Sequence, residues 1–318
     1  MFRPLALILA ATALTATPAA ALQNEEPQQN DGTRDILNRI LDRVLGPEEQ
    51  GDPNAQADAT TTTDTGTTAL TIDSVLAADF RAEDRARDVY RHPSETLQFF
   101  RVQPGMRVAE FAPGGGWYSR VLAPYIGAAG RYYAVNFDSA GRELNAEQRQ
   151  RIESWPRTFP TQLQQSTGVP ASAVVAFESD EIPAGVEGTV DRILIFRNIH
   201  SMLNANVAGR ELRNLRTLLA DDGLVGVVQH RAPASETWER ANGSRGYVRQ
   251  ADVVKLFEIN GFELVQSSEI NANRSDPANW ERGVWTLPPT YALGDADRDR
   301  YTAIGESDRM TLLFRKAR

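Results

Sequence analysis

The sequence predicts an α/β fold: a doubly wound sheet of seven strands, mostly parallel, that closes with an antiparallel pair. Short apolar runs alternate with helical patterns along most of the chain, which is typical of a parallel sheet covered on both faces. The last two runs, 262–267 and 309–315, are joined by a long polar loop without a helical pattern. Because a parallel neighbour would need a crossover helix, we expect these two strands to be antiparallel.

The stretch 106–138 forms the first βαβ unit. Its parts are a strand at 106–109, a glycine turn at 114–116, a helix at 117–126 and a strand at 132–137. Such a unit, within about 30 residues, is the smallest one that holds a nucleotide-like cofactor. Its glycines allow the backbone to approach a ligand where any Cβ would collide. The first strand leads into an acid, Glu110, which we therefore expect to lie beside the ligand.

The other elements follow in alternation. Further strands are expected at 172–177, 190–199, 224–228, 262–267 and 309–315, and further helices at 141–155, 206–220 and 247–260. Before the first strand, the chain from 72 to 100 has a helical pattern, and Pro93 is suited to the first turn of a helix. This helical approach either covers the cofactor or only packs against the sheet.

The N-terminus has the features of a cleavable signal peptide, residues 1–21. Arg3 gives a basic head, an apolar run covers 5–16, and small residues follow at 18–21. The apolar run is shorter than the roughly 20 residues of a membrane span. We therefore expect a periplasmic or secreted protein, without stable membrane insertion after cleavage.

An acidic linker is expected at 22–68, which leaves 69–318 as the folded domain. Residues 23–68 contain ten acids and three arginines, a net charge of −7, while the whole chain carries −8. The domain is thus nearly neutral, and a nucleic-acid partner, which needs a basic face, is not expected. Within the linker, 33–45 has the apolar stripe of a short amphipathic helix. It either docks on the domain or mediates self-association or partner binding.

The residues of the glycine turn discriminate between cofactors. No Lys follows the glycines, which excludes a phosphate-binding loop of the GxxxxGK[ST] kind. The dinucleotide spacing GxGxxG has Ser119 in place of its third glycine, and Glu110 would repel a pyrophosphate. S-adenosylmethionine (SAM) fits better, because its sulfonium and ammonium groups are attracted by a carboxylate at the end of the first strand. An acid at the end of the second strand can accept the ribose hydroxyls.

Four phrases, EFAPGGGWYSRVLAPY, FRNIH, GVWTLPP and ESDRMTLLFRK, together with the strand order, resemble the class I SAM-dependent methyltransferases, whose fold is Rossmann-like. More narrowly, they are similar to a branch of exported bacterial methyltransferases of unknown substrate. The resemblance covers 80–316 and implies SAM as the cofactor. The family's first motif is an acid followed by glycines two, four and six residues later, which here are Glu110, Ala112, Gly114 and Gly116. Ala112 thus replaces the first glycine, and Gly115 lies in the same turn.

The resemblance also implies contacts further along the cofactor. The family's ribose-binding acid falls on Asn136, and Asp138, two residues later, is an alternative for that role. The position that contacts adenine falls on Asp180, with Glu178 as a rival.

Candidate catalytic residues are His200, His230 and Tyr118. The two histidines follow the fourth and fifth strands, at the carboxyl edge where α/β proteins bind ligands, and each is either functional or structural. His200 is our first candidate for a general base or for orienting the acceptor. Tyr118, directly after the glycines, lines the pocket or packs in the helix. A metal site is not expected, because the histidines show no local ligand spacing such as HxxxH.

Three further polar residues, Arg197, Asn198 and Arg231, either bind an anionic acceptor or form buried ion pairs. Cysteine is absent, so disulfides and thiolate catalysis are excluded. The first hypothesis is a SAM-dependent methyltransferase that acts on a small-molecule acceptor bound by the loops 232–247 and 271–307. Two alternatives stay open: a catalytically degenerate module that binds an adenosyl ligand, and an NAD-type Rossmann enzyme.

Overall fold

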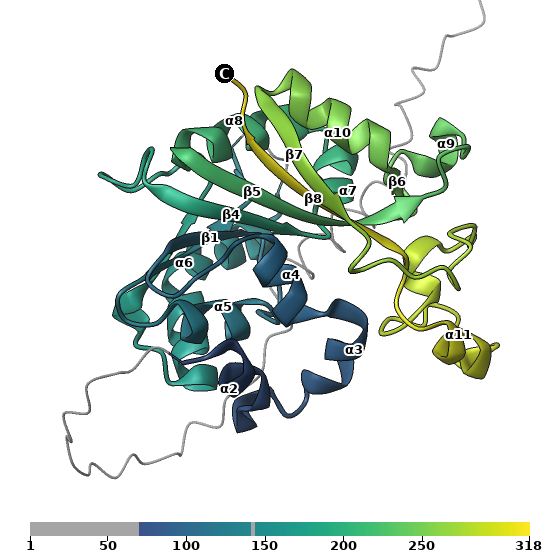
Figure 1. Cartoon of the computed structure of the whole chain (residues 1–318), viewed down its shortest axis with the longest axis horizontal. Helices are drawn as coiled ribbons and strands as arrows, with labels where there is room; N and C mark the ends of the chain where they lie inside the picture. Colours follow the sequence, from purple (N-terminus) through teal and green to yellow (C-terminus); the bar gives the residue numbers. More distant parts are fainter. Residues whose placement is uncertain (1–69, 141–143) are drawn as a thin grey trace, which may run out of the picture.

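The computed structural model describes residues 70–140 and 144–318 (Figure 1). The expected signal peptide at 1–21 and the acidic linker at 22–68, with its helix at 33–45, lie outside the described residues. They stay predictions. Among the described residues, no helix has both the length and the apolar character that crossing a membrane requires.

One sheet forms the centre of the domain. Its strands are β1 (Arg107–Phe111), β2 (Arg131–Asn136), β3 (Val174–Glu178), β4 (Val190–Phe196), β5 (Leu219–Ala232), β6 (Val248–Arg249), β7 (Phe262–Ser268) and β8 (Arg309–Lys316). The order is β3-β2-β1-β4-β5-β8-β7, with β6 beside β5. Strands β1 to β5 pair in parallel, whereas β8 is antiparallel to both β5 and β7. The predicted fold class is confirmed. The seven expected strands are present, and the two-residue strand β6 joins them.

Helices cover both faces of this sheet (Figure 1). They are α2 (Ile72–Ala77), α3 (Asp88–Arg91), α4 (Pro93–Phe99), α5 (Ser119–Ile126), α6 (Ala146–Thr167), α7 (Ile199–Asn204), α8 (Ala208–Leu218), α9 (Trp238–Ala241), α10 (Gln250–Ile259) and α11 (Arg298–Ile304). Short 3₁₀ turns lie at Asp79–Arg81, Arg85–Arg87, Ala171–Ala173 and Gly283–Thr286. Helices α4, α5 and α6 pack on one face, and α8 and α10 on the other.

Successive side chains of each strand pack into the hydrophobic clusters on opposite faces of the sheet. In β4, Ile193 and Ile195 belong to the cluster under α8 and α10, whereas Leu194 belongs to the cluster under α4, α5 and α6. Successive side chains of a strand point to opposite faces, so a strand buried on both faces needs apolar residues at every position. This explains why the buried parts of β4 and β5, residues 193–196 and 224–228, are continuous apolar runs rather than alternating ones.

The helical approach packs closely on the sheet. Pro93 begins α4 as expected, and Phe100, just after this helix, is fully buried against β5. A Cβ on Gly226 of β5 would lie 2.5 Å from the Phe100 ring, so a glycine is required there. The α4 part of the approach is therefore a packing element.

Helix α6 differs from its expected extent. The sequence predicts a helix that ends at Trp155, but the helix continues to Thr167 through Pro156 and Pro160. A proline inside a helix removes a hydrogen bond and crowds the preceding turn. Here Trp155, Phe159 and Leu163 are buried in the core on either side of the prolines, and this packing outweighs the local cost.

Candidate functional site

A cavity of about 570 Å³ lies where β1, β4 and β5 end at the carboxyl edge of the sheet. The turn after β1 forms one wall, and the residues that follow β4 form the floor. The region around α3 and the long segment between β7 and β8 complete it. Lining residues from this last segment are Val284, Trp285, Pro288, Pro289, Thr290, Glu306 and Ser307. The position agrees with the general rule that open α/β sheets bind ligands beyond the carboxyl ends of their strands.

The glycine turn borders this cavity. Ala112, Gly114 and Gly115 line it, whereas Gly116 lies behind it at the start of α5. Ala112 has a φ of 49°, a left-handed conformation that favours glycine. The turn therefore adopts, with an alanine at this position, a backbone conformation that favours glycine. No atom lies within 4 Å of the place where a Cβ on Gly115 would be, so the backbone is open to a ligand there.

Glu110 is the acid at the end of β1, and it lines the cavity although it is only 2% exposed. Its Oε2 accepts hydrogen bonds from the Tyr132 hydroxyl at 2.6 Å and the Ser119 hydroxyl at 2.8 Å. Burial raises the pKa of Glu110 to about 7, although both hydrogen bonds act in the other direction. A bound cation would favour the ionised form of this carboxyl.

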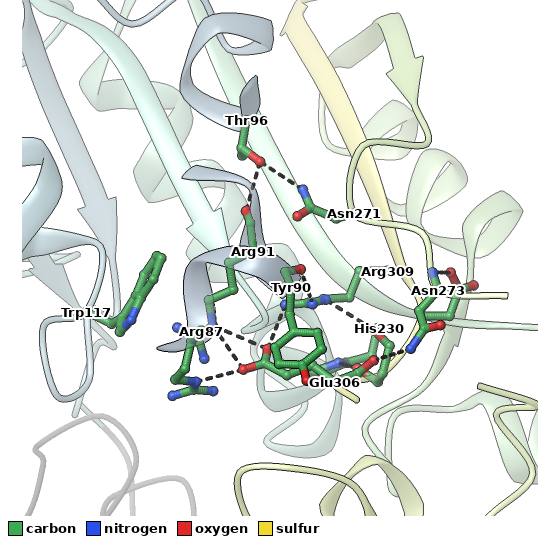
Figure 2. A network of polar contacts seen from close by, with 12 residues as sticks. Arg87, Tyr90, Arg91, Thr96, Trp117, His230, Asn271, Asn273, Glu306 and Arg309 are labelled. Carbon is green, nitrogen blue, oxygen red and sulfur yellow. Dashed lines mark hydrogen bonds and ion pairs between the residues drawn. The ribbon is translucent and has the colours of Figure 1, made fainter. Parts of the chain in front are cut away.

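A second acid, Glu306, is the centre of an arginine network (Figure 2). It accepts from Arg87 at 2.7 Å, from Arg91 at 3.3 Å and from Arg309 at 3.0 Å. Burial alone would raise the pKa of Glu306, but the three guanidinium groups together hold it well below its usual range. The Arg91 guanidinium also lies 4.5 Å above the ring of Trp117. Figure 2 shows how the three arginines converge on this one carboxylate.

The candidate catalytic residues occupy different positions around the cavity. His230 lines it, and its Nδ1 lies 2.6 Å from the Ser307 hydroxyl. His200 lies in α7 rather than at the end of a strand, is 2% exposed, and is not among the lining residues. The two imidazole rings are 5.6 Å apart. Tyr118 both lines the cavity and packs, because its ring stacks on Phe196 at 3.5 Å.

The candidate ribose and adenine residues lie at the ends of β2 and β3, outside the cavity lining. Asn136 and Asp138 are 2% and 3% exposed, and Asp138 forms an ion pair with Arg210 at 2.8 Å. Carboxylate oxygens of Asp138, Glu178 and Asp180 lie within 4.8 Å of one another, close enough to share a cation. Burial and the nearby Asp138 raise the pKa of Asp180. Acidic hydrogen-bond acceptors are thus concentrated at the ends of β2 and β3.

The three candidates for binding an anionic acceptor have different roles. Arg231 is paired with Glu269 at 2.7 Å and with Asp308 at 2.8 Å, which supports the ion-pair interpretation. Asn198 donates its amide to the backbone oxygens of Ala112 at 3.0 Å and Phe196 at 3.1 Å, so it holds the ends of β1 and β4 together. Arg197 lines the cavity.

Five charged residues of the cavity wall were not predicted from the sequence: Asp84, Arg87, Arg91, Arg120 and Glu306. Arg91 and Glu306 are 215 positions apart in the chain, so no local motif could link them. The only signal available was the run of arginines from 81 to 91 in the helical approach.

No family model matches the chain, and no curated protein matches it. Among solved structures, a SAM-dependent methyltransferase from Aquifex aeolicus is 16% identical, with 64% of this chain and 94% of that chain covered and a TM-score of 0.43. The YcgJ protein from Bacillus subtilis is 15% identical, with 71% and 97% covered and a TM-score of 0.42. The mitomycin 7-O-methyltransferase MmcR is 16% identical, with 78% and 61% covered and a TM-score of 0.39. At such values the function has to be inferred from the chain's own residues.

Proposed function

We propose that this chain is a SAM-dependent methyltransferase that acts on a small-molecule acceptor. The observation that supports this most is that Glu110 lines the cavity without an ion pair among the described residues. Three acids line the cavity, and two of them are neutralised: Asp84 by Arg120, and Glu306 by its arginines. Within the described residues Glu110 has only neutral hydrogen-bond partners and no ion pair. The sulfonium and ammonium groups of SAM would supply the missing positive charge, whereas a pyrophosphate would add to the repulsion.

The residues at the strand ends fit the remaining parts of this cofactor. The open backbone at Gly114 and Gly115 would take the methionine part against the end of β1. Asn136 or Asp138 would accept the ribose hydroxyls, and Asp180, with Glu178 as the alternative, would contact adenine. When bound, SAM supplies a methyl group that is activated by its positively charged sulfur.

The chain's own contribution to methyl transfer would be positioning and proton removal. Methyl transfer is an in-line displacement, and holding the acceptor atom against the sulfonium provides most of the acceleration. A base is needed when the acceptor is a protonated oxygen or nitrogen. We assign this role to His230 because it lines the cavity, with Ser307 at 2.6 Å to orient its ring. His200, buried behind it, would position His230, and Tyr118 would form the wall beside the acceptor.

A second candidate function is a binding module that holds an adenosyl ligand without turnover. Two departures from the family pattern favour it: Ala112 in place of the first glycine and Asn136 in place of the ribose acid. A signal peptide that takes the chain away from the cytosol, where SAM is made, points in the same direction.

Titration calorimetry of the mature protein with SAM, S-adenosylhomocysteine and NAD tests the proposal. We expect both adenosyl ligands to bind and NAD to give no heat of binding. Binding of NAD without binding of SAM would contradict the proposal. Binding of SAM without release of a labelled methyl group to a broad panel of acceptors would favour the binding module.

We also propose that the chain is exported to the periplasm or secreted. The basic head, the apolar run and the small residues of 1–21 support this. Mass spectrometry of the protein from the periplasmic or extracellular fraction should show an N-terminus near residue 22. An intact Met1 on protein confined to the cytosol would refute it.

A further inference from the structure

The wall of the cavity around Glu306 has a surplus of positive charge. Arg87, Arg91 and Arg309 all form ion pairs with this single carboxylate. Burial lowers the pKa of Arg197 well below its usual value, and the charges of Arg91, Arg87 and Arg309 lower it further, whereas that of Glu306 raises it. Three guanidinium groups are thus paired with one acid, and a fourth lines the same cavity. Buried charges that are not compensated are costly, so such a surplus is typical of a site that receives a negative charge.

Arg197 is the guanidinium of this group that forms no ion pair with a described residue, and its charge acts on Glu110 and Glu306 only at longer range. Its side chain lines the cavity and makes no hydrogen bond or ion pair with the residues that the structure describes. Its backbone has a φ of 58°, a left-handed conformation that costs about 1 kcal/mol or more in a residue with a side chain. The fold thus holds a guanidinium at the end of β4 at an energetic cost, without an ion-pair partner among the described residues.

Arg91 is buried, fixed in place, and incompletely satisfied. It is 2% exposed, its Nε contacts both oxygens of Glu306 at 3.3 Å, and its guanidinium lies over Trp117. Nevertheless its Nη1 has no hydrogen-bond partner among residues 70–140 and 144–318. The carboxylate and the indole ring therefore orient a guanidinium in the cavity wall while one of its donors stays available.

We propose that Arg91 and Arg197 together bind an anionic group of the methyl acceptor, either a carboxylate or a phosphate. This inference rests on the proposed function. Guanidinium groups are suited to both anions because their planar donors match the spacing of the oxygens. His230 lines the same cavity, so an anion held by the two arginines would anchor the acceptor within the compartment that contains the base. The substrate class is therefore a small organic acid or phosphate ester.

The rival occupant of this arginine pair is the carboxylate of SAM itself. The experiment separates the two by titrating the mature protein with inorganic phosphate and with acetate, each with and without saturating S-adenosylhomocysteine. The test variant is Arg197→Gln, which removes the charge without breaking a side-chain hydrogen bond or ion pair among the described residues. The matched control is Arg213→Gln, which removes the same charge from the exposed face of α8. A further variant, Arg197→Lys, keeps the charge but not the fork of donors.

We expect at least one of the two anions to bind in the presence of S-adenosylhomocysteine, and the stronger of them to identify the acceptor's group. Arg197→Gln should weaken that binding at least tenfold, Arg197→Lys by less, and Arg213→Gln not at all. The affinity of Arg197→Gln for S-adenosylhomocysteine should stay within twofold of wild type.

Two results would overturn the inference. One is anion binding that is absent or is unchanged in Arg197→Gln. The other is competition between the anion and S-adenosylhomocysteine together with a loss of S-adenosylhomocysteine affinity in the variant, because the arginine would then serve the cofactor. If S-adenosylhomocysteine fails to bind at all, the proposed function fails, while the titration without it still shows whether the arginine site exists.

Discussion

Among single residues, Glu110 has the chemistry most sensitive to pH. In the folded protein burial raises its pKa from 4.5 to about 7, so it binds a proton more tightly than in the unfolded chain. Its contribution to stability is therefore complete below pH 4.5 and is lost as the pH rises towards 7. The shift corresponds to about 3 kcal/mol, because one pKa unit is equivalent to about 1.4 kcal/mol. Ionisation of the buried Glu110 carboxyl therefore lowers the stability of the folded protein.

Replacement of Glu110 by Gln should separate stability from binding. Gln retains an oxygen that accepts from Tyr132 and Ser119 but carries no charge. We expect Glu110→Gln to raise the free energy of unfolding at pH 8 by up to about 3 kcal/mol and to change it little at pH 4.5, as measured by urea unfolding. SAM affinity at pH 8 should fall at least tenfold, or about 1.4 kcal/mol.

The control for this prediction is Glu187→Gln, which removes an exposed carboxylate far from the cavity lining. It should change neither quantity. If wild type and Glu110→Gln showed the same stability difference between pH 4.5 and pH 8, the pKa of Glu110 would not be raised. If they bound SAM equally well, Glu110 would not contact the cofactor.

Site residues that belong to one local motif could be predicted from the sequence, whereas those that meet only in the fold could not. Glu110, Gly114 and Gly115 belong to a local motif, and the structure brings them to the cavity together. Arg91 and Glu306 meet only through the fold, so their roles were beyond any pattern of spacing. His230 is expected at the ligand-binding edge, and the structure places it there inside the last part of β5, which ends at Ala232. His200 was placed on the same argument, but Ile199 already begins a helix that turns this residue away from the cavity lining.

At the scale of elements, Asn198 connects β1 to β4 at the floor of the cavity. Its Nδ2 donates to the backbone oxygens of Phe111 at 3.3 Å, Ala112 at 3.0 Å and Phe196 at 3.1 Å. Ala112 is the residue in the left-handed conformation at the start of the glycine turn. The amide therefore stabilises a backbone shape that an alanine would otherwise adopt only at a cost.

We expect Asn198→Ala to destabilise the domain by about 1–3 kcal/mol, because buried carbonyl groups lose their donor. SAM affinity should fall with it, since the glycine turn is no longer held. The matched control is Asn204→Ala, which removes a single amide hydrogen bond to Gly243 in a part-buried position away from the turn. Urea unfolding and SAM titration measure both effects. An equal loss of stability in the two variants, without a change in SAM affinity, would show that Asn198 does not support the turn.

Element boundaries were predictable where local pattern and packing agree. The βαβ unit, the apolar parts of β4 and β5, and the antiparallel β7–β8 pair follow from the hydrophobic runs. The sequence predicts no helix in the connection between β7 and β8, and this is wrong, because α11 lies within it. The end of helix α6 could not be predicted in this way, because buried aromatic residues beside its prolines stabilise the helix beyond them. Strand β6 consists of two residues whose pairing with Arg231 and Ala232 depends on tertiary contacts.

At the scale of the whole molecule, Glu306 joins the two ends of the folded chain. It precedes β8 and contacts Arg87 and Arg91, which lie before the sheet begins, and Arg309 of β8 itself. The same ion pairs hold the helical approach against the segment between β7 and β8 and so close the cavity from two sides. Asn273 supports this arrangement, because its amide donates to the backbone oxygens of Ile304 and Glu306.

Removal of the Glu306 charge should therefore break the contact between the helical approach and the segment between β7 and β8. Glu306→Gln leaves buried arginines without their counter-charge, which typically costs about 3–5 kcal/mol when one partner of a buried pair is lost. Because the pKa of Glu306 is lowered on folding, its contribution is present above the unfolded pKa of 4.5 and is lost as the pH falls. The difference in the free energy of unfolding between wild type and Glu306→Gln, measured with urea, should hence be large at pH 7 and shrink on acidification below 4.5.

The matched control is Glu269→Gln, which also breaks an ion pair with an arginine. The side chain of Glu269 is 65% exposed, so its replacement should cost less than about 1 kcal/mol. Equal losses in the two variants would mean that burial adds nothing to the Glu306 network and that the cavity is closed by apolar packing instead.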